Sequence, residues 1–513
     1  MTGEIGKLME WLEGFLWSVP FIFFVLAMGF YYLIATKFFV IRYFGHIFAQ
    51  TLGSLIKNKE SISKREGYIS PFEAVCIAIG GCVGAGNIAG VATAIAVGGP
   101  GALFWLIMFG FLAMAIKLAE AALGSHYRHK DEAGRFTGGP MWYMEKGIGR
   151  EMGMKIGFGL AFFFCIAFMS ICLQGSQVYT IAEVLNAVHG TDMIMVTLVY
   201  TALIYIFIWG GLQSVAKVAS RLVPFMCVAY ILAALGVIFM NLGEVPGAIY
   251  LICHDALNGT AAVGGFAGAG VVAAMRSGVV RAINSCEAGQ GSSAFAHSPA
   301  DTVHPIRQGL WGCIEGFVDI VVVCTITSLV IVISGVWNSG TAGGALSYMA
   351  FKTEYGQFGG YLLSLILVTF GLTTTTGWYV YYNMVIEYFF RDNPISRDRA
   401  VLAFKLIFPA INIVIVSYIT LTGNGPVMFW TLISILIVPG ILVNLVALFL
   451  LRGKVFALLA DYKARYMGIG TVDPNFSIFY EDDPEVFQRE EALREELRRI
   501  VREKRAAAER PEA

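Results

Sequence analysis

Long apolar runs separated by short polar segments dominate this chain of 513 residues. A run of about 18 or more apolar residues has the length of a membrane-spanning helix. The pattern predicts eleven spans, over residues 14–36, 70–97, 101–124, 156–187, 193–210, 214–240, 262–296, 308–335, 358–390, 399–421 and 426–451. The fourth, seventh and ninth spans exceed what a straight perpendicular helix needs, so we expect tilts, breaks or interfacial extensions there.

The composition agrees with a membrane protein. The chain is 57% hydrophobic and 14% charged, with a mean hydropathy of +0.69, whereas a soluble domain is usually about 25% charged. The net charge is zero, and no basic cluster suggests a nucleic-acid partner. The nine cysteines show no CxxC pair, so we interpret them as small buried hydrophobic residues. The expected fold class is an all-α polytopic membrane protein with about eleven transmembrane helices.

Positive charges concentrate in alternate loops, which predicts the orientation. The loop after the first span carries Lys37, Arg42, Lys57, Lys59, Lys64 and Arg65, and later loops on the same side carry further Lys and Arg residues. The opposite side carries only Lys7 and Lys352. The positive-inside rule therefore places the N-terminus outside and the C-terminus in the cytoplasm of a cell membrane. Acidic residues precede the first span, so we expect no cleaved signal peptide.

A glycine-rich segment interrupts the second span. Residues 80–91 read GGCVGAGNIAGV, and each glycine costs a helix about 1 kcal/mol relative to alanine. Unpaired backbone at membrane depth is tolerated only where it is buried in protein or lines a cavity. Broken helices near the midplane are where secondary transporters bind substrate and coupling ions. We therefore expect a helix break at Gly84 and a transport function.

The same pattern recurs in the second half of the chain. Residues 264–270 read GGFAGAG and match GGCVGAG at five of seven positions. Five spans separate the two segments, and the predicted topology gives them opposite directions. This arrangement predicts a five-plus-five inverted repeat over about 70–240 and 262–451, with a discontinuous first helix in each half. Alternatively, the glycines serve only close helix packing.

The predicted organisation has three parts. Residues 1–60 form one extra peripheral helix and a linker, residues 61–455 form the transporter core, and residues 456–513 form a charged cytoplasmic tail. In the tail, Asp483 and Pro484 are suited to begin an amphipathic helix. Such a helix is either solvated or docks on the membrane or on a second copy.

Several motifs together resemble the alanine/glycine:cation symporter family, also called sodium:alanine symporters. They are VGAGNIAGVATAIAVGGPGALFW (83–105), KLAEA (117–121), GGPMWYMEKG (138–147), HPIRQGL (304–310), FVDIVVVCTIT (317–327) and GWYVYY (377–382). The resemblance covers about residues 70–450. It implies a leucine-transporter-type fold and cation-driven uptake of small neutral amino acids, chiefly alanine or glycine.

The chain departs from the family pattern at a few positions. Cys82 and Ala85 stand where the family usually has threonines, and Cys286 stands where it usually has asparagine. After the GW motif, Tyr382 precedes Asn383 and Met384, where the family shows Tyr-Gly-Glu. These departures bear on substrate and ion identity.

The break supplies candidate substrate-binding residues. The N–H groups that open a half-helix can hold a carboxylate, because that end of the helix dipole is positive. Gly84, Ala85, Gly86 and Asn87 occupy this position, and the Asn87 side chain could serve either the substrate carboxylate or a second cation. By resemblance, three further residues line the pocket: Gln174, Phe266 and Trp378. Each of these three could instead be a packing residue or a bridge between helices.

The resemblance also implies a sodium site. The carbonyl oxygens of Gly80 and Val83 would be two of its ligands, and hydroxyls of Thr373 and Thr374 would complete it. The alternative for these threonines is a bond to a carbonyl one turn earlier in their own helix. A proton-coupled variant would use Glu73, Glu120 or Asp319.

Charged residues within spans are costly and usually paired or functional. Arg276, Arg281 and Glu287 fall in the seventh span and Asp319 in the eighth. We expect an inner gate in which Arg281 pairs with Glu287 or Asp319, the alternative being a static ion pair. His297 and His304 are interpreted as structural. The chain shows no catalytic constellation and no nucleotide motif, so an enzyme is not expected; a channel with a continuous pore is a further alternative.

Overall fold

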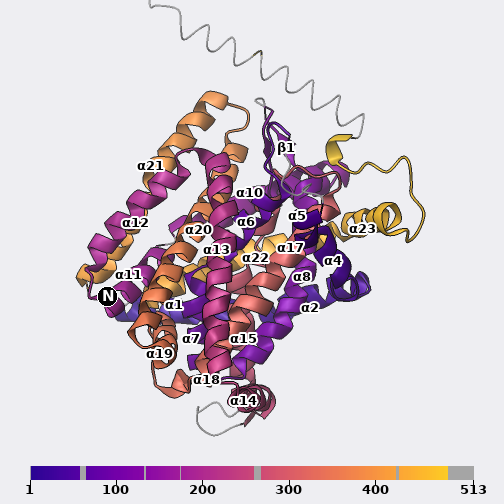
Figure 1. Ribbon diagram of the computed structural model, residues 1–513. Coiled ribbons are helices and arrows are strands. Elements are labelled where there is room, and N and C mark those ends of the chain that lie inside the picture. Colours follow the sequence, from indigo (N-terminus) through magenta and orange to yellow (C-terminus); the bar gives the residue numbers. More distant parts are fainter. Residues whose placement is uncertain are drawn as a thin grey trace, which may run out of the picture.

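The computed structural model describes residues 2–57, 65–131, 134–173, 175–258, 267–422, 427–482 and 499, and it is almost entirely helical there. The strands in this part of the chain, β1 (His129–Lys130) and β2 (Phe136–Thr137), form one short antiparallel hairpin. This hairpin and helix α14 (Val245–Asn258) lie at opposite ends of the bundle (Figure 1). The predicted all-α class is confirmed.

Seven of the predicted spans correspond to single helices. They are α2 (Val19–Ala35), α8 (Ala102–His126), α12 (Met193–Ile208), α13 (Gly211–Met240), α20 (Gln357–Phe389), α21 (Pro394–Thr422) and α22 (Val427–Leu450).

The other four spans consist of consecutive helical pieces. The second span is α6 (Pro71–Cys82), the π-helical turn η1 (Gly86–Gly90) and α7 (Val91–Gly98). The fourth is α10 (Ile156–Ser170), η3 (Ile171–Leu173) and α11 (Ser176–His189). The seventh is α15 (Ala267–Cys286) and α16 (Ser292–His297), and the eighth is α17 (Pro305–Gly316), the π-helical η4 (Phe317–Cys324) and α18 (Thr325–Ile333).

Shorter helices lie outside the spans or connect them. They are α1 (Thr2–Leu16), α3 (Phe39–Arg42), α4 (Phe44–Gln50), α5 (Leu52–Lys57), α9 (Pro140–Trp142), η2 (Tyr143–Glu151), η5 (Val336–Asn338), α19 (Gly343–Tyr355), α23 (Arg452–Met467) and η6 (Tyr480–Asp482). The connecting helices α14 and α19 were not predicted from the sequence.

By length and composition, seven described helices can cross a bilayer unaided, or eight when the bent second span is included. Helices α10 and α12 are apolar but shorter. The count is roughly consistent with the predicted eleven spans. The predicted tail helix beyond Asp483 lies outside the described residues, apart from Arg499.

The start of α6 explains why the second span begins where it does. The Ser70 hydroxyl accepts a hydrogen bond from the Glu73 N–H at 3.1 Å, and the Glu73 carboxylate accepts one from the Ser70 N–H at 2.8 Å. Pro71 occupies the first helical position, where its missing N–H costs nothing. This reciprocal pair of bonds satisfies N–H groups that a helix start otherwise leaves free.

Small residues allow the central helices to approach closely. A Cβ added at Gly312 of α17 would lie 2.7 Å from the Lys117 carbonyl of α8, and one at Gly309 would lie 2.9 Å from the Leu118 carbonyl. Glycine is therefore required where α17 crosses α8, as in other close helix contacts in membranes.

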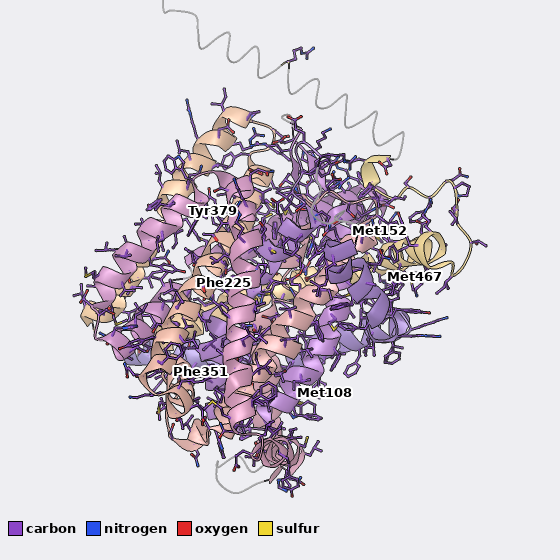
Figure 2. The ribbon with its side chains drawn as sticks, in the orientation of Figure 1. Met108, Met152, Phe225, Phe351, Tyr379 and Met467 are labelled. Atoms are coloured by element: carbon purple, nitrogen blue, oxygen red, sulfur yellow. The ribbon has the colours of Figure 1, made fainter. Side chains whose placement is uncertain are left out.

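Large apolar side chains cover the periphery of the bundle. Phe225 of α13 and Met108 of α8 expose 62% and 42% of their surface (Figure 2), whereas Phe351 and Tyr379 are buried. Exposed apolar surface of this kind is suited to contact with lipid. The core lies around α6 and α8; α6 packs against α13, α16, α17 and α20.

Candidate functional site

The second span is broken at the predicted place. Helix α6 ends at Cys82, Val83 has an extended conformation (φ −82°, ψ 92°), and η1 begins at Gly86. The pieces on either side of the break are bent by 48°. A Cβ added at Gly84 would lie 2.6 Å from Thr374 Oγ1. Glycine at this position therefore lets the broken backbone approach α20.

Side chains accept hydrogen bonds from two N–H groups at the break. The Gly84 N–H donates to Asn87 Oδ1 at 2.9 Å, and the Ala85 N–H donates to Gln177 Oε1 at 3.0 Å. Of the predicted pocket residues, Gln174 and Phe266 lie outside the described residues. Gln177 was not predicted as a site residue. It could have been selected because it is a second glutamine about one helical turn after Gln174 in the same apolar span.

The break and α20 bring oxygen atoms together. The Thr374 hydroxyl lies 2.9 Å from the carbonyl oxygen of Gly80 and 3.4 Å from that of Val83. The Thr373 hydroxyl instead donates to the Phe370 carbonyl at 2.9 Å within its own helix. The structure thus brings together three of the four predicted sodium ligands, while Thr373 adopts the alternative back-bonded geometry.

Trp378 lies one turn further along α20. Its indole N–H donates to Glu287 Oε1 at 2.8 Å, and its ring stacks on Phe168 of α10 with centroids 5.2 Å apart. The side chain is only 4% exposed. Trp378 therefore links α10, α20 and the seventh span, and its role in substrate selection stays a prediction.

The described part of the GGFAGAG motif is helical, and the interruption that the structure describes in the seventh span lies further along the chain. Residues 264–266 are outside the described part, but residues 267–286 form continuous helix. The chain leaves helical geometry in the EAGQG segment, residues 287–291, where Glu287, Gly289 and Gly291 have φ values of 58°, 90° and 85°. Right-handed helix excludes positive φ, so the interruption occurs in this segment.

Glu120 of α8 supports the EAGQG segment. Its Oε1 accepts hydrogen bonds from the N–H groups of Gly289 and Gly291, both at 3.0 Å, and from Asn444 Nδ2 at 2.8 Å. Asn444 also donates to the Gly289 carbonyl at 2.9 Å. These bonds replace the intrahelical bonds that the unwound backbone loses, as burial requires.

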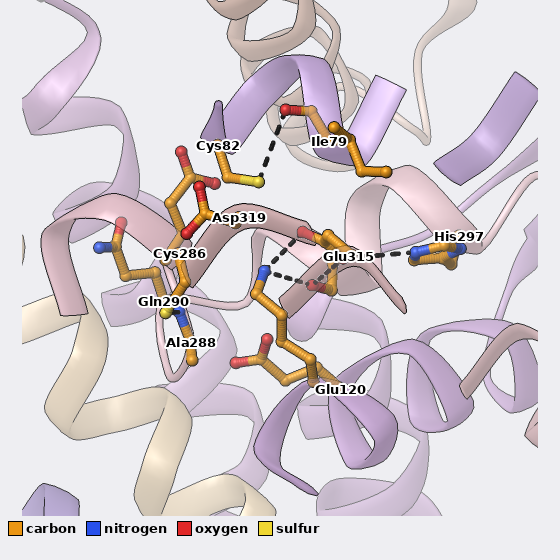
Figure 3. Close-up of polar contacts among 12 residues, drawn as sticks. Ile79, Cys82, Glu120, Cys286, Ala288, Gln290, His297, Glu315 and Asp319 are labelled. Carbon is orange, nitrogen blue, oxygen red and sulfur yellow. Dashed lines mark hydrogen bonds and ion pairs between the residues drawn. The ribbon is translucent and has the colours of Figure 1, made fainter. Parts of the chain in front are cut away.

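A buried ionic cluster lies beside this segment (Figure 3). Lys117 Nζ is 2.5 Å from Glu315 Oε1, and both side chains are at most 1% exposed. Ser293 donates to Glu315 Oε2 at 2.8 Å, and His297 Nε2 lies 3.5 Å from the same oxygen. The cluster joins α8, α16 and α17. In the sequence, Lys117 stands out only as part of KLAEA, because residues 198 positions apart carry no visible sign of pairing.

The predicted gate residues do not pair with one another. Asp319 Oδ1 accepts a hydrogen bond from Asn87 Nδ2 at 2.5 Å, and Glu287 bonds Trp378. Among the described residues, Arg281 forms no ion pair with either carboxylate. The gate therefore stays a prediction for another conformation, and Asp319 here joins η4 to η1.

Different contacts tie the start of the second span to the seventh. The Ile69 N–H donates to the Pro299 carbonyl at 3.1 Å, and the Asp301 N–H donates to the Ile69 carbonyl at 2.8 Å. Arg65 and Asp301 form an exposed ion pair at 2.7 Å. On the predicted topology these contacts lie at the cytoplasmic end. His297 and His304 make structural contacts; His304 accepts from the Ile306 N–H at the start of α17.

Two of the departures from the family pattern make local contacts. Cys82 Sγ lies 3.5 Å from the Ile79 carbonyl oxygen of its own helix, and Cys286 Sγ accepts from the Ala288 N–H at 3.4 Å (Figure 3). Tyr382 donates to the Ile171 carbonyl at 3.0 Å and so connects α20 with the fourth span. Cys286 thus helps to shape the EAGQG segment.

Comparison with known proteins gives consistent matches. The model of the sodium:alanine symporter family matches residues 2–475. The sodium/alanine symporter AgcS of Methanococcus maripaludis is 34% identical over 86% of this chain and 96% of its own length. The putative sodium/proton-dependent alanine carrier protein YrbD of Bacillus subtilis is 34% identical over 78% of this chain and 81% of its own.

A solved structure shows the same fold. The crystal structure of MhsT in complex with L-phenylalanine superposes with a TM-score of 0.54 at 15% identity, covering 76% of this chain and 90% of that one. At this identity the likeness concerns the fold alone. It agrees with the leucine-transporter-type arrangement that the sequence predicts.

Proposed function

The chain belongs to the sodium:alanine symporter family, a family of membrane transporters rather than enzymes, and we propose that it couples inward sodium flow to uptake of alanine or glycine. Transport would proceed by alternating access. The observation that carries the proposal is the convergence of the Thr374 hydroxyl with the carbonyl oxygens of Gly80 and Val83 at the helix break.

This convergence suits sodium. Sodium prefers hard oxygen ligands, and transporters supply them from carbonyls that an unwound helix leaves free. Gly80 and Val83 lie in the last turn of α6 and at its end, and α20 contributes a hydroxyl from the other half of the repeat. An ion bound here would hold the two repeats together. Its affinity would therefore depend on their relative position, which is the requirement for coupling.

The same break suits a small amino acid. Asn87 follows the break and is fully buried, while Trp378 contributes a large buried ring near the EAGQG segment. A bulky wall restricts the volume left for a substrate side chain. Alanine and glycine have the smallest side chains, and the names of AgcS and YrbD refer to alanine.

A proton-coupled transporter of the same fold is the second candidate. Glu120 Oε2 and Asp319 Oδ2 are buried without a hydrogen-bond partner in the described residues, and the name of YrbD includes proton dependence. A carboxyl oxygen without a partner is suited to carry a proton. Glu73, the third predicted proton carrier, instead caps α6.

Uptake into proteoliposomes tests both candidates. The purified chain should accumulate labelled alanine or glycine under an inward sodium gradient at constant pH, and glutamine and larger amino acids serve as the comparison set. Substrate accumulation that depends on a pH gradient and is unchanged by the sodium gradient would favour the proton-coupled candidate. Flux without saturation or accumulation would indicate a channel and overturn the symporter.

We predict that Thr374→Val raises the sodium concentration for half-maximal uptake by roughly tenfold, about 1.4 kcal/mol, because it removes one ligand oxygen. The substrate affinity at saturating sodium should change less. Thr373→Val is the matched control, since the Thr373 hydroxyl is bonded within its own helix. Equal sodium curves for Thr374→Val and the unmodified protein would remove Thr374 from the ion site.

Trp378→Leu should admit bulkier amino acids. The substitution removes much of the ring, and one methylene in a binding pocket is worth roughly 1–3 kcal/mol of discrimination. We expect uptake of valine or leucine relative to alanine to rise about tenfold in competition assays. Trp311→Leu is the control, because Trp311 is equally buried but packs against Phe72. Unchanged selectivity in Trp378→Leu would exclude this residue from the pocket.

A further inference from the structure

Arg281 of α15 lies directly against the broken second span. A Cβ added at Gly86 of η1 would lie 2.6 Å from Arg281 Nη2, and one added at Gly90 would overlap Nη1. These two glycines, about one turn apart, therefore leave the space that the guanidinium occupies. Any other residue at either position would displace the arginine from η1.

The guanidinium of Arg281 has no bonded partner in the part of the chain that the structure describes. Arg281 makes neither a hydrogen bond nor an ion pair with any described residue, and its Nε is buried. The two carboxylates predicted as its gate partners each bond another residue through one oxygen: Asp319 Oδ1 accepts from Asn87, and Glu287 Oε1 accepts from Trp378. An unpaired charge at membrane depth is costly, and arginine keeps its charge at all relevant pH values. Such a site is suited to an incoming anion.

The arginine also remains reachable. Arg281 and the adjoining Gly86 and Gly90 are partly exposed, whereas Asn87 and Asp319 are fully buried. Ser277, one turn before Arg281, donates to the Ala94 carbonyl at 2.9 Å and fixes α15 against α7. Arg281 is thus held beside the break with part of its surface exposed, while its Nε is buried.

The N–H groups of the break are less available than the sequence suggested. Those of Gly84 and Ala85, which we expected to hold the substrate carboxylate, donate to Asn87 and Gln177. A carboxylate that bound there would have to displace both side-chain oxygens. Arg281 requires no such displacement, and its planar fork matches a carboxylate with two parallel hydrogen bonds.

We propose that Arg281 binds the carboxylate of the transported amino acid, with Gly86 and Gly90 positioning the guanidinium at the break. This inference rests on the proposed function and assigns one part of its substrate site. The gate role expected for Arg281 stays a separate prediction. The alternative is that Arg281 only balances the charge of Asp319 at a distance.

Equilibrium binding to the purified full-length protein separates these roles. The probes are labelled L-alanine, with and without competing L-alaninamide, which keeps the ammonium and methyl groups but lacks the carboxylate. The unmodified protein should bind labelled alanine, and alaninamide should not compete for its binding. In Arg281→Gln, alanine affinity should fall about 100-fold or more and the preference over alaninamide should disappear, while Arg281→Lys should retain part of both. Arg276→Gln is the control, since Arg276 is exposed five residues earlier on α15.

The double variant Arg281→Gln/Asp319→Asn keeps the test decisive if the single variant folds poorly. This variant removes one positive and one negative charge and so restores charge balance. If Arg281 only balances the charge of Asp319, the double variant should again bind alanine in preference to alaninamide. Our proposal predicts a folded protein that still does not distinguish alanine from alaninamide. Unchanged alanine affinity in Arg281→Gln would overturn this inference alone. Failure of the unmodified protein to bind alanine or glycine would overturn the proposed function, and the inference with it.

Discussion

Glu315→Met is expected to destabilise the protein by about 3–5 kcal/mol, because it leaves the Lys117 ammonium buried without its counter-charge. The pair is 2.5 Å apart and at most 1% exposed. Ser293 offers Lys117 a neutral hydroxyl at 2.9 Å, which does not compensate a full charge. Thermal unfolding of the purified protein in detergent should show a lower midpoint, with less folded protein recovered from membranes.

The double variant Lys117→Met/Glu315→Met is the informative control. Replacing both members of a buried pair by apolar side chains of similar length is often neutral or stabilising, so most of the lost stability should return. Asp301→Asn is the exposed counterpart. Arg65 is 64% exposed, and such surface pairs contribute about 0–1 kcal/mol. A Glu315→Met midpoint equal to that of Asp301→Asn would show that the buried pair contributes little.

The cluster also bears on the mechanism. Lys117 and Glu120 lie about one turn apart on α8; Lys117 joins α16 and α17, and Glu120 holds the EAGQG segment. The seventh span is thus bonded to α8 at its interruption and in the helix α16 that follows it. At its break the second span is bonded by Asn87 and Gln177, which accept from the Gly84 and Ala85 N–H groups, and by the Thr374 hydroxyl, which donates to the Gly80 carbonyl. Side chains from other helices therefore support both interruptions.

The first break was predictable because its cause is local. Four glycines within seven residues of a membrane span weaken any continuous helix, and Gly84 also lies against Thr374. The interruption at residues 287–291 was not predicted, because glycine content alone does not determine helix breaking. Alanine and glycine at 267–270 are helical, whereas the positive φ values of Gly289 and Gly291 occur where Glu120 and Asn444 from other spans bond the backbone. Support of this kind depends on tertiary contacts that a single sequence does not display.

The residues of the candidate site also fall into those that could be predicted from the sequence and those that could not. Gly80, Val83 and Thr374 meet as the resemblance implied, because the break and the threonine run are both sequence motifs. Thr373 was predicted with them, and in this structure its hydroxyl bonds the Phe370 carbonyl of its own helix, since consecutive helical residues point in directions about 100° apart. Gln177 and the Lys117–Glu315 pair were missed, since each depends on which helices are neighbours.

Asn87→Ala is expected to reduce uptake by about 100-fold or more while the protein still reaches the membrane. The Asn87 amide serves both sides of the break: Oδ1 accepts from the Gly84 N–H at 2.9 Å, and Nδ2 donates to Asp319 at 2.5 Å. Alanine leaves a buried N–H and a buried carboxylate oxygen without these partners. Each lost hydrogen bond costs about 1–3 kcal/mol. Both losses destabilise the conformation of the break that we propose binds the ligands. Uptake of labelled alanine per folded molecule measures the effect.

Asn412→Ala is the matched control, because Asn412 is also buried but donates to the Pro409 carbonyl of its own helix α21. Its uptake should stay near that of the unmodified protein. The exchange Asn87→Asp/Asp319→Asn tests the bond itself, since it reverses donor and acceptor between η1 and η4. Partial recovery in the exchange, with none in Asn87→Asp alone, is the result that the structure predicts. If Asn87→Ala transports at more than about a tenth of the normal rate, the break tolerates loss of this bond, and the binding conformation is held by other contacts.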